Sequence, residues 1–240
     1  MSKSLTAKKS EHGFSLIELI IAMTITLVVL SIATTLLAQS LNVRTRSNEN
    51  VDALADAERA LNIMSREIAQ AGFNLNDNGI VAADSVVDGN NNSTIRIRAN
   101  LNRYDEDATA TARNGIGVPG ADSGEDVKYF IHPAGTTTLL ARYDPYATDG
   151  PASTVVANRL DRLRIRYFAQ RITYNTDADN CDIRDWSQDE VAPANARYVV
   201  IAVCVRQRET GSPGSPGYQP EHNLLLTSDV TLRNANLQTY

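Results

Sequence analysis

The stretch GFSLIELIIAMTITLVVLSIATTLLAQS, residues 13–40, decides the fold. No residue from 19 to 43 carries a charge, yet Glu18 lies near the front of this apolar run. As a helix, residues 14–38 would be about 37 Å long, which exceeds the roughly 30 Å hydrocarbon core of a bilayer. The stretch therefore predicts a helix that is long enough to span a membrane.

The charges around this run favour one orientation. Lys3, Lys8 and Lys9 precede it, and no basic residue follows it immediately. Because basic residues stay on the cytoplasmic side, we expect a cytoplasmic N-terminus and an exported C-terminal body. A secretory signal peptide fits poorly, since its apolar core is shorter. A plain membrane anchor fits the length but leaves Glu18 unexplained, because a charge in hydrocarbon costs roughly 3 kcal/mol or more.

The residues GFSLIEL, 13–19, resemble a known signal sequence, and this resemblance explains the carboxylate of Glu18. They resemble the signal of type IV prepilins and type II secretion pseudopilins, in which a short basic leader ends in glycine. The resemblance implies that a prepilin peptidase cuts between Gly13 and Phe14 and methylates the new amine of Phe14. It also implies that Glu18 of an incoming subunit pairs with the N-terminal amine of a subunit already assembled. A Phe14–Glu18 pair within one chain is the alternative, because the two are one helical turn apart.

The helical pattern continues beyond the apolar run. Apolar residues recur at spacings of three and four, which predicts one stripe along a helix. No proline or glycine interrupts residues 14–71, and Gly72 is a suitable C-terminal stop. We therefore expect a single helix over residues 14–71, about 87 Å long. The stripe consists of Val51, Leu54, Ala57, Leu61, Met64, Ile68 and Ala71.

After Gly72 the apolar pattern changes to alternation. Such alternation predicts strands with one buried face. Residues 198–205 are apolar on both faces, which is typical of a central strand. The expected fold class is α+β and, by the resemblance, pilin-like: one long N-terminal helix packed on a mainly antiparallel sheet with long loops. The other expected strands lie at residues 95–99, 127–132, 137–143, 162–167 and 228–234.

This organisation predicts three parts. Residues 1–13 are the prepilin leader peptide, and residues 14–40 are the transmembrane or filament-core half of the helix. Residues 41–240 are the exported pilin-like globular domain, which includes the second half of the helix. The chain has a net charge of -5, and the acidic body argues against nucleic-acid binding. We find no catalytic or cofactor-binding signature, so we expect neither enzyme activity nor a cofactor.

Two features of the body suggest local chemistry. Cys181 and Cys204 would face an oxidising compartment, where they either form a disulfide or remain two unpaired thiols. Asn175, Asp177 and Asp179 stand at alternate positions, like the oxygen ligands of a calcium loop. The glycine that such a loop needs is missing, so a solvated turn is the default and calcium is a weak candidate.

Arg162, Arg164 and Arg166 form a basic stripe on one strand. They could contact DNA phosphates, although the net charge of the chain opposes this. The alternatives are the polar face of a half-buried strand, or salt bridges to a neighbouring subunit.

Four further stretches resemble the PilW-type minor pilins and, in layout, the larger minor pseudopilin of type II secretion. They are RALNIMSREIAQAGF, NRLDRLRIRYF, ARYVVIAVCVR and DVTLRNAN, within residues 59–236. The resemblance implies a minor pilin that starts in the inner membrane and then joins a type IV pilus. Its partners would be other minor pilins, the major pilin and a tip adhesin, in a complex that primes assembly and caps the tip. A type II secretion pseudopilin is the alternative, and a membrane-tethered binding domain would need no cut at Gly13.

Overall fold

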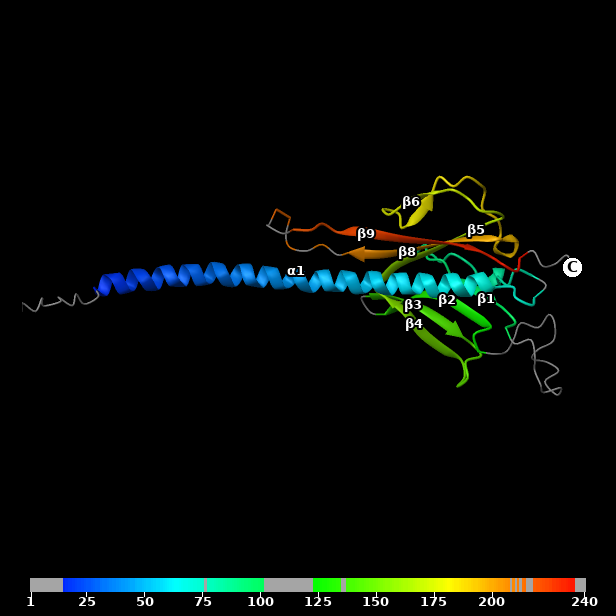
Figure 1. The fold of residues 1–240 in the computed structure, drawn as a ribbon, viewed down its shortest axis with the longest axis horizontal. Coiled ribbons are helices and arrows are strands. Elements are labelled where there is room, and N and C mark those ends of the chain that lie inside the picture. The colour runs from blue at the N-terminus through cyan, green and yellow to red at the C-terminus, as the bar shows by residue number, and fades with distance from the viewer. Residues whose placement is uncertain are drawn as a thin grey trace, which may run out of the picture. The chain divides into compact units, whose positions relative to one another are not determined.

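This computed structural model describes residues 15–75, 77–101, 123–134, 137–207, 209, 211, 213–214 and 218–235. Over these residues the chain forms one long helix followed by antiparallel strands (Figure 1). This arrangement confirms the expected α+β class. Contacts divide the chain into two units, Met1–Asn48 and Glu49–Tyr240.

Helix α1 spans Leu16–Gln70 without a break. Gly72 follows it with a φ of +76°, the left-handed conformation in which many helices end. A Cβ at this position would lie 2.7 Å from the carbonyl oxygen of Asp77, so the site requires glycine. Nδ2 of Asn234 donates hydrogen bonds to the carbonyl oxygens of Gln70 and Ala71, at 3.3 and 3.2 Å. The C-terminal segment thus satisfies carbonyls that the last helical turn leaves open.

The strands divide among three sheets, where the sequence predicted one. The sheets have the orders β1-β2-β3-β4, β5-β8-β9 and β6-β7, and β8 is a central strand as expected. Two short 3-10 helices are present: Ala82–Asp84 lies between α1 and β1, and Pro193–Asn195 lies between β7 and β8. The strand bounds are β1 Ile95–Arg98, β2 Asp126–Ala134, β3 Thr137–Asp144, β4 Ala152–Asn158, β5 Leu160–Phe168, β6 Asn175–Asp177, β7 Asp182–Arg184, β8 Tyr198–Gln207 and β9 His222–Thr231.

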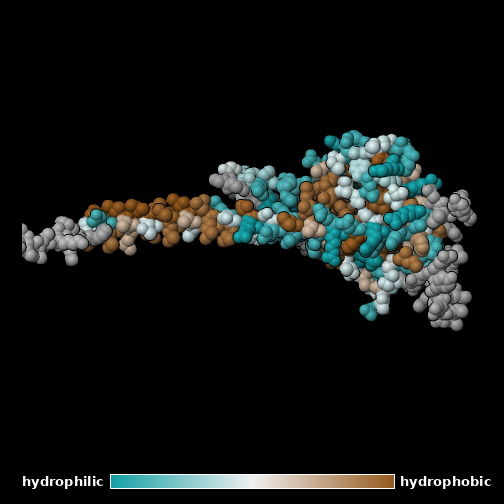
Figure 2. All heavy atoms as spheres, in the orientation of Figure 1, coloured by the Kyte–Doolittle hydropathy of each residue, from teal (hydrophilic) through white to brown (hydrophobic). Residues whose placement is uncertain are grey.

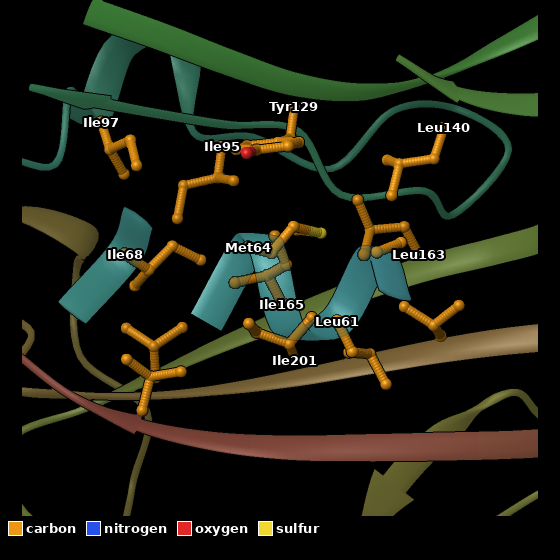
Figure 3. Packing of buried hydrophobic residues seen from close by; sticks show 14 of the residues in the cluster. Leu61, Met64, Ile68, Ile95, Ile97, Tyr129, Leu140, Leu163, Ile165 and Ile201 are labelled. Carbon is orange, nitrogen blue, oxygen red and sulfur yellow. The ribbon is translucent and has the colours of Figure 1, made fainter. Parts of the chain in front are cut away.

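The second half of α1 lies between the two larger sheets, with β1–β4 on one side and β5, β8 and β9 on the other (Figure 1). Leu61, Met64 and Ile68 of the helix contact both layers in one continuous core (Figure 3). Each such buried side chain contributes about 1.5–3 kcal/mol. The core residues facing them include Ile95, Ile97, Tyr129 and Leu140 from the first sheet and Leu163, Ile165 and Ile201 from the second.

The apolar stripe of α1 is confirmed over most of its length and wrong at its start. Val51 is 61% exposed and lies outside the core. Ala53 and Ala60, which the predicted stripe did not include, are buried. Because alanine is small, these two positions allow strands to approach the helix closely.

A smaller core lies apart from the helix. Phe168 of β5 and Tyr198 and Val200 of β8 pack with Ile172 and Ile183, and Ile183 belongs to β7. The segment that contains the β6-β7 hairpin therefore covers part of the second sheet. It supplies the apolar cover that a strand such as β8, buried on both faces, requires.

Candidate functional site

The expected cleavage and methylation site, Gly13 and Phe14, lies outside the described residues, as does the rest of the leader. The described chain starts at Ser15, and Glu18 falls in the first turn of α1. Ser15 accepts the first helical hydrogen bond through its carbonyl oxygen, from the amide of Leu19 at 3.2 Å. The helix therefore begins at the place where the expected cut would leave a new N-terminus.

The carboxylate of Glu18 reaches back toward the start of the helix. Its Oε2 accepts a hydrogen bond from the backbone amide of Ser15 at 3.4 Å. The first amides of a helix lack partners and carry partial positive charge, so a carboxylate is stabilised there. This geometry brings the carboxylate of Glu18 toward the N-terminal end of the segment, where Phe14 precedes Ser15.

The first half of α1 presents an apolar surface. Side chains from Leu16 to Val43 are exposed in the isolated chain, and Figure 2 shows hydrophobic residues gathered over this part of the helix. Glu18 is the sole charged residue between positions 16 and 43. An apolar surface of this extent requires lipid or other protein around it.

Threonine hydroxyls in this segment are satisfied by the helix itself. Thr26 donates to the carbonyl oxygen of Ala22 at 2.7 Å, and Thr35 donates to that of Ser31 at 2.6 Å. Thr24 and Thr34 make similar bonds to carbonyls three or four residues earlier. Such bonds lower the cost of placing hydroxyls in an apolar medium. Threonine within an apolar helix is the sequence signal for such bonds, which were not among the predictions above.

Among the described residues, one helix is long and apolar enough to cross a membrane, judged by length and composition. It is α1, and none of its most apolar window is buried within the protein. A helix of a soluble core would instead be covered. The burial pattern is therefore consistent with a segment that inserts into a membrane or into a protein assembly.

In the second unit, Cys181 and Cys204 are joined by a disulfide, with their Cα atoms 5.4 Å apart. Cys204 lies in β8 and Cys181 lies between β6 and β7. Both residues are buried. The bond therefore ties the β6-β7 hairpin to the second sheet.

Asn175 and Asp177 lie in β6, and Asp179 lies in the turn that follows it. The carboxylate of Asp177 accepts hydrogen bonds from the backbone amide and Nδ2 of Asn180, at 3.2 and 2.9 Å. Nδ2 of Asn175 donates to Asp185 instead of joining the other two. Over the described part of the chain, no group of three or more His, Cys, Asp or Glu side chains is arranged to hold a metal ion.

The arginines of the basic stripe on β5 bind partners within the chain. Nε of Arg164 lies 2.9 Å from Oδ2 of Asp182, and the Arg164 side chain is 9% exposed. Arg166 binds the same carboxylate and also stacks over the ring of Trp186, 4.7 Å from its centre. The third member, Arg162, donates to the carbonyl oxygen of Asn180.

Asp182 is the acceptor at the centre of this group. Burial alone would raise the pKa of Asp182, but hydrogen bonds from Arg166 and the amide of Ile183, together with the positive charge of Arg166, lower the pKa overall. The carboxylate therefore stays ionised, and Arg164 and Arg166 share its single negative charge. Glu190 places a second negative charge beside Arg166. This arrangement stabilises the contact between β5 and β7 and leaves little of the stripe available to a ligand.

Comparison with known proteins returned one family. Residues 8–34 match the prokaryotic N-terminal methylation motif, which contains Gly13, Phe14 and Glu18. A search of curated proteins found no match to the chain. The matched motif implies processing by a prepilin peptidase and assembly with other pilins, and its helix is consistent with inner-membrane anchoring followed by incorporation into a pilus. Together with the long helix and the antiparallel sheets, it supports a structural subunit of the type IV pilin or pseudopilin class.

Proposed function

We propose that this chain is a PilW-like minor pilin of a type IV pilus. In this proposal it joins other minor pilins to prime assembly, contacts the major pilin, and sits at the tip with an adhesin. The observation that carries the proposal is the methylation motif over residues 8–34 at the start of an unbroken helix, Leu16–Gln70. This helix leads directly into an α+β domain.

Processing would precede assembly. A prepilin peptidase removes residues 1–13 by cutting after Gly13, and methylation of the new amine at Phe14 leaves its positive charge in place. Residues 14–40 then hold the protein in the inner membrane as a single span, with residues 41–240 in the periplasm. The disulfide between Cys181 and Cys204 supports this location, because such bonds persist in oxidising compartments.

Assembly would then depend on Glu18. The amine of Phe14 and the carboxylate of Glu18 are opposite charges in a segment that is otherwise uncharged. Neither charge is stable in hydrocarbon without a partner. We propose that Glu18 of an incoming subunit pairs with the N-terminal amine of a subunit already in place, and that the pair within one chain holds the carboxylate before docking.

A chromosomal deletion scored on two readouts tests this function. Surface pili should be lost while exoprotein secretion stays intact, and a plasmid copy of the wild-type chain should restore the pili. Lost secretion with intact pili would instead assign the protein to a type II secretion pseudopilus. An uncut N-terminus on the protein purified from membranes would contradict both assignments and favour a tethered binding domain.

A further inference from the structure

Arg44 is the first charged residue that follows Glu18 along α1. It is exposed, and it has no hydrogen-bond or ion-pair partner among the residues that the structure describes. The positions one helical turn before and after it, residues 40–41 and 47–48, carry no charge. The helix itself therefore offers no counter-charge at the spacings where side chains meet. Because a guanidinium is always ionised in proteins, Arg44 is available to an anion from outside the chain.

The place of Arg44 along the helix indicates which anion it meets. Residues 16–43 are exposed and form a helical segment about 42 Å long. A bilayer is about 40–45 Å thick when its headgroup layers are included. A segment of this length that starts in one headgroup layer therefore ends in the other. Since helical side chains lean toward the N-terminus of their helix, we expect the guanidinium of Arg44 at the level of the second phosphate layer.

The charges on the following turns of α1 favour a phosphate contact at Arg44 alone. The terminal nitrogens Nη1 and Nη2 of Arg46 are buried, which withholds them from a lipid. Glu49 is already paired with Arg159, at 3.4 Å. Asp52, which follows, is exposed and negative. A phosphate surface is therefore attracted at Arg44 and repelled farther along the helix.

We propose that Arg44 binds the phosphate group of a phospholipid in the periplasmic leaflet of the inner membrane. The planar guanidinium can donate two parallel hydrogen bonds to phosphate oxygens. This contact fixes the depth of α1 in the bilayer and is released when the segment leaves the membrane. The inference rests on the membrane stage of the proposed function and is independent of the filament that the chain joins. A carboxylate of another protein is the competing partner, and it contains no phosphorus.

Solid-state NMR tests the contact through that phosphorus. The full-length chain, with carbon-13 at Cζ of its arginines, is placed in vesicles of phosphatidylethanolamine and phosphatidylglycerol in phosphate-free buffer. Recoupling to lipid phosphorus-31 should dephase part of the arginine Cζ signal. The lysines of the leader do not contribute, because they have no guanidinium carbon. Arg44→Gln should abolish the dephasing.

Arg59→Gln is the matched control, because Arg59 is exposed on the same helix but lies beyond Asp52. It should keep the dephasing. Arg44→Lys retains the positive charge and should also lose the arginine signal, so the result does not depend on insertion of Arg44→Gln. An absence of dephasing in the wild type would overturn the proposal, as would dephasing that survives Arg44→Gln or Arg44→Lys.

Two further measurements separate the alternatives. In a phosphorus-free detergent with added inorganic phosphate the dephasing should be absent, and an equal signal there would overturn a lipid as the source. Recovery of the chain with the vesicles after an alkaline wash tests anchoring by itself. An anchored chain without dephasing would contradict the role of Arg44 alone. A chain that is washed off would contradict the membrane stage of the proposed function and this inference with it.

Discussion

Tyr129 of β2 donates its hydroxyl hydrogen to Oε2 of Glu67 in α1, across 2.6 Å. The tyrosine is fully buried, and Nε of Arg142 in β3 lies 3.2 Å from the same carboxylate oxygen. Burial of the ring and the negative charge of Glu67 raise the pKa of Tyr129, so the hydroxyl stays protonated and donates. One carboxylate thus fixes the helix against two strands of the first sheet.

Replacing Glu67 by alanine should destabilise this contact strongly. The change leaves the Tyr129 hydroxyl buried without its acceptor and removes one of the two carboxylates that pair with Arg142. It should lower the free energy of unfolding by about 1–3 kcal/mol. Urea denaturation followed by circular dichroism measures this. Glu58→Ala is the control, because Glu58 is exposed on the same helix and its loss should change stability by less than about 0.5 kcal/mol. Equal effects of the two changes would show that Glu67 is not a structural contact.

Acid should weaken the group around Asp182. Because folding lowers the pKa of Asp182, the unfolded chain binds its proton more tightly than the folded chain does. The stability from this residue is therefore present above the unfolded pKa of about 3.9 and is lost as pH falls through the lower folded pKa. Asp182→Asn should reduce the free energy of unfolding at neutral pH and flatten its decline below pH ~4, measured by urea titrations at a series of pH values.

The control for Asp182 is Asp189→Asn, an exposed carboxylate in the loop that follows β7. It should leave the stability at neutral pH unchanged. An Asp182→Asn variant that matched the wild type at every pH would show that Arg164 and Arg166 need no carboxylate.

The disulfide should contribute to stability chiefly through the unfolded chain. Cys181 and Cys204 are 23 residues apart in sequence, and closing a loop of that size contributes roughly 3 kcal/mol. Replacing both cysteines by alanine should lower the free energy of unfolding by about that amount, which appears as a lower urea concentration at the midpoint of unfolding. Alkylation of the unreduced, unfolded wild-type chain should modify neither thiol, and quantitative modification of both would rule the bond out.

The parts of the fold that follow a strong periodic pattern could be predicted from sequence. The helix, the central strand β8 and most strands with one buried face have such patterns. β9 begins already at His222, before the predicted start at residue 228, because its first residues pair with the polar end of β8. β4 was missed because it is largely exposed on both faces. The two strands of the β6-β7 hairpin were missed because each has three residues.

Contacts between side chains far apart in the sequence were harder to predict than the helices and strands themselves. The arginines of β5 form a clear pattern in the sequence. Their partner, Asp182, could not be identified from sequence, because it is one of many acidic residues and only the fold brings it next to Arg164 and Arg166. Glu18, by contrast, could be recognised from the sequence as a functional candidate, because a charged carboxylate in an apolar membrane segment costs free energy. The candidate site was therefore recognisable from a local motif, whereas the partner of Glu18 depends on the assembled state.

Glu18→Ala should separate processing from assembly. The leader and Gly13 are unchanged in this variant, so cleavage and methylation at Phe14 should proceed, as mass spectrometry of the membrane-bound protein would show. Incorporation into filaments should fall sharply, because the N-terminal amine of the receiving subunit loses its counter-charge in a medium where an unpaired charge is costly. Immunoblots of sheared pili measure the incorporated fraction.

Thr26→Val is the matched control for Glu18→Ala. It removes a polar group from the same segment, but the Thr26 hydroxyl bonds to its own helix at Ala22, so incorporation should remain normal. Normal incorporation of Glu18→Ala would refute a role for the carboxylate in assembly. If neither variant were incorporated into filaments, the cause would be a general sensitivity of the helical segment to substitution. The loss would then not be specific to the charge of Glu18.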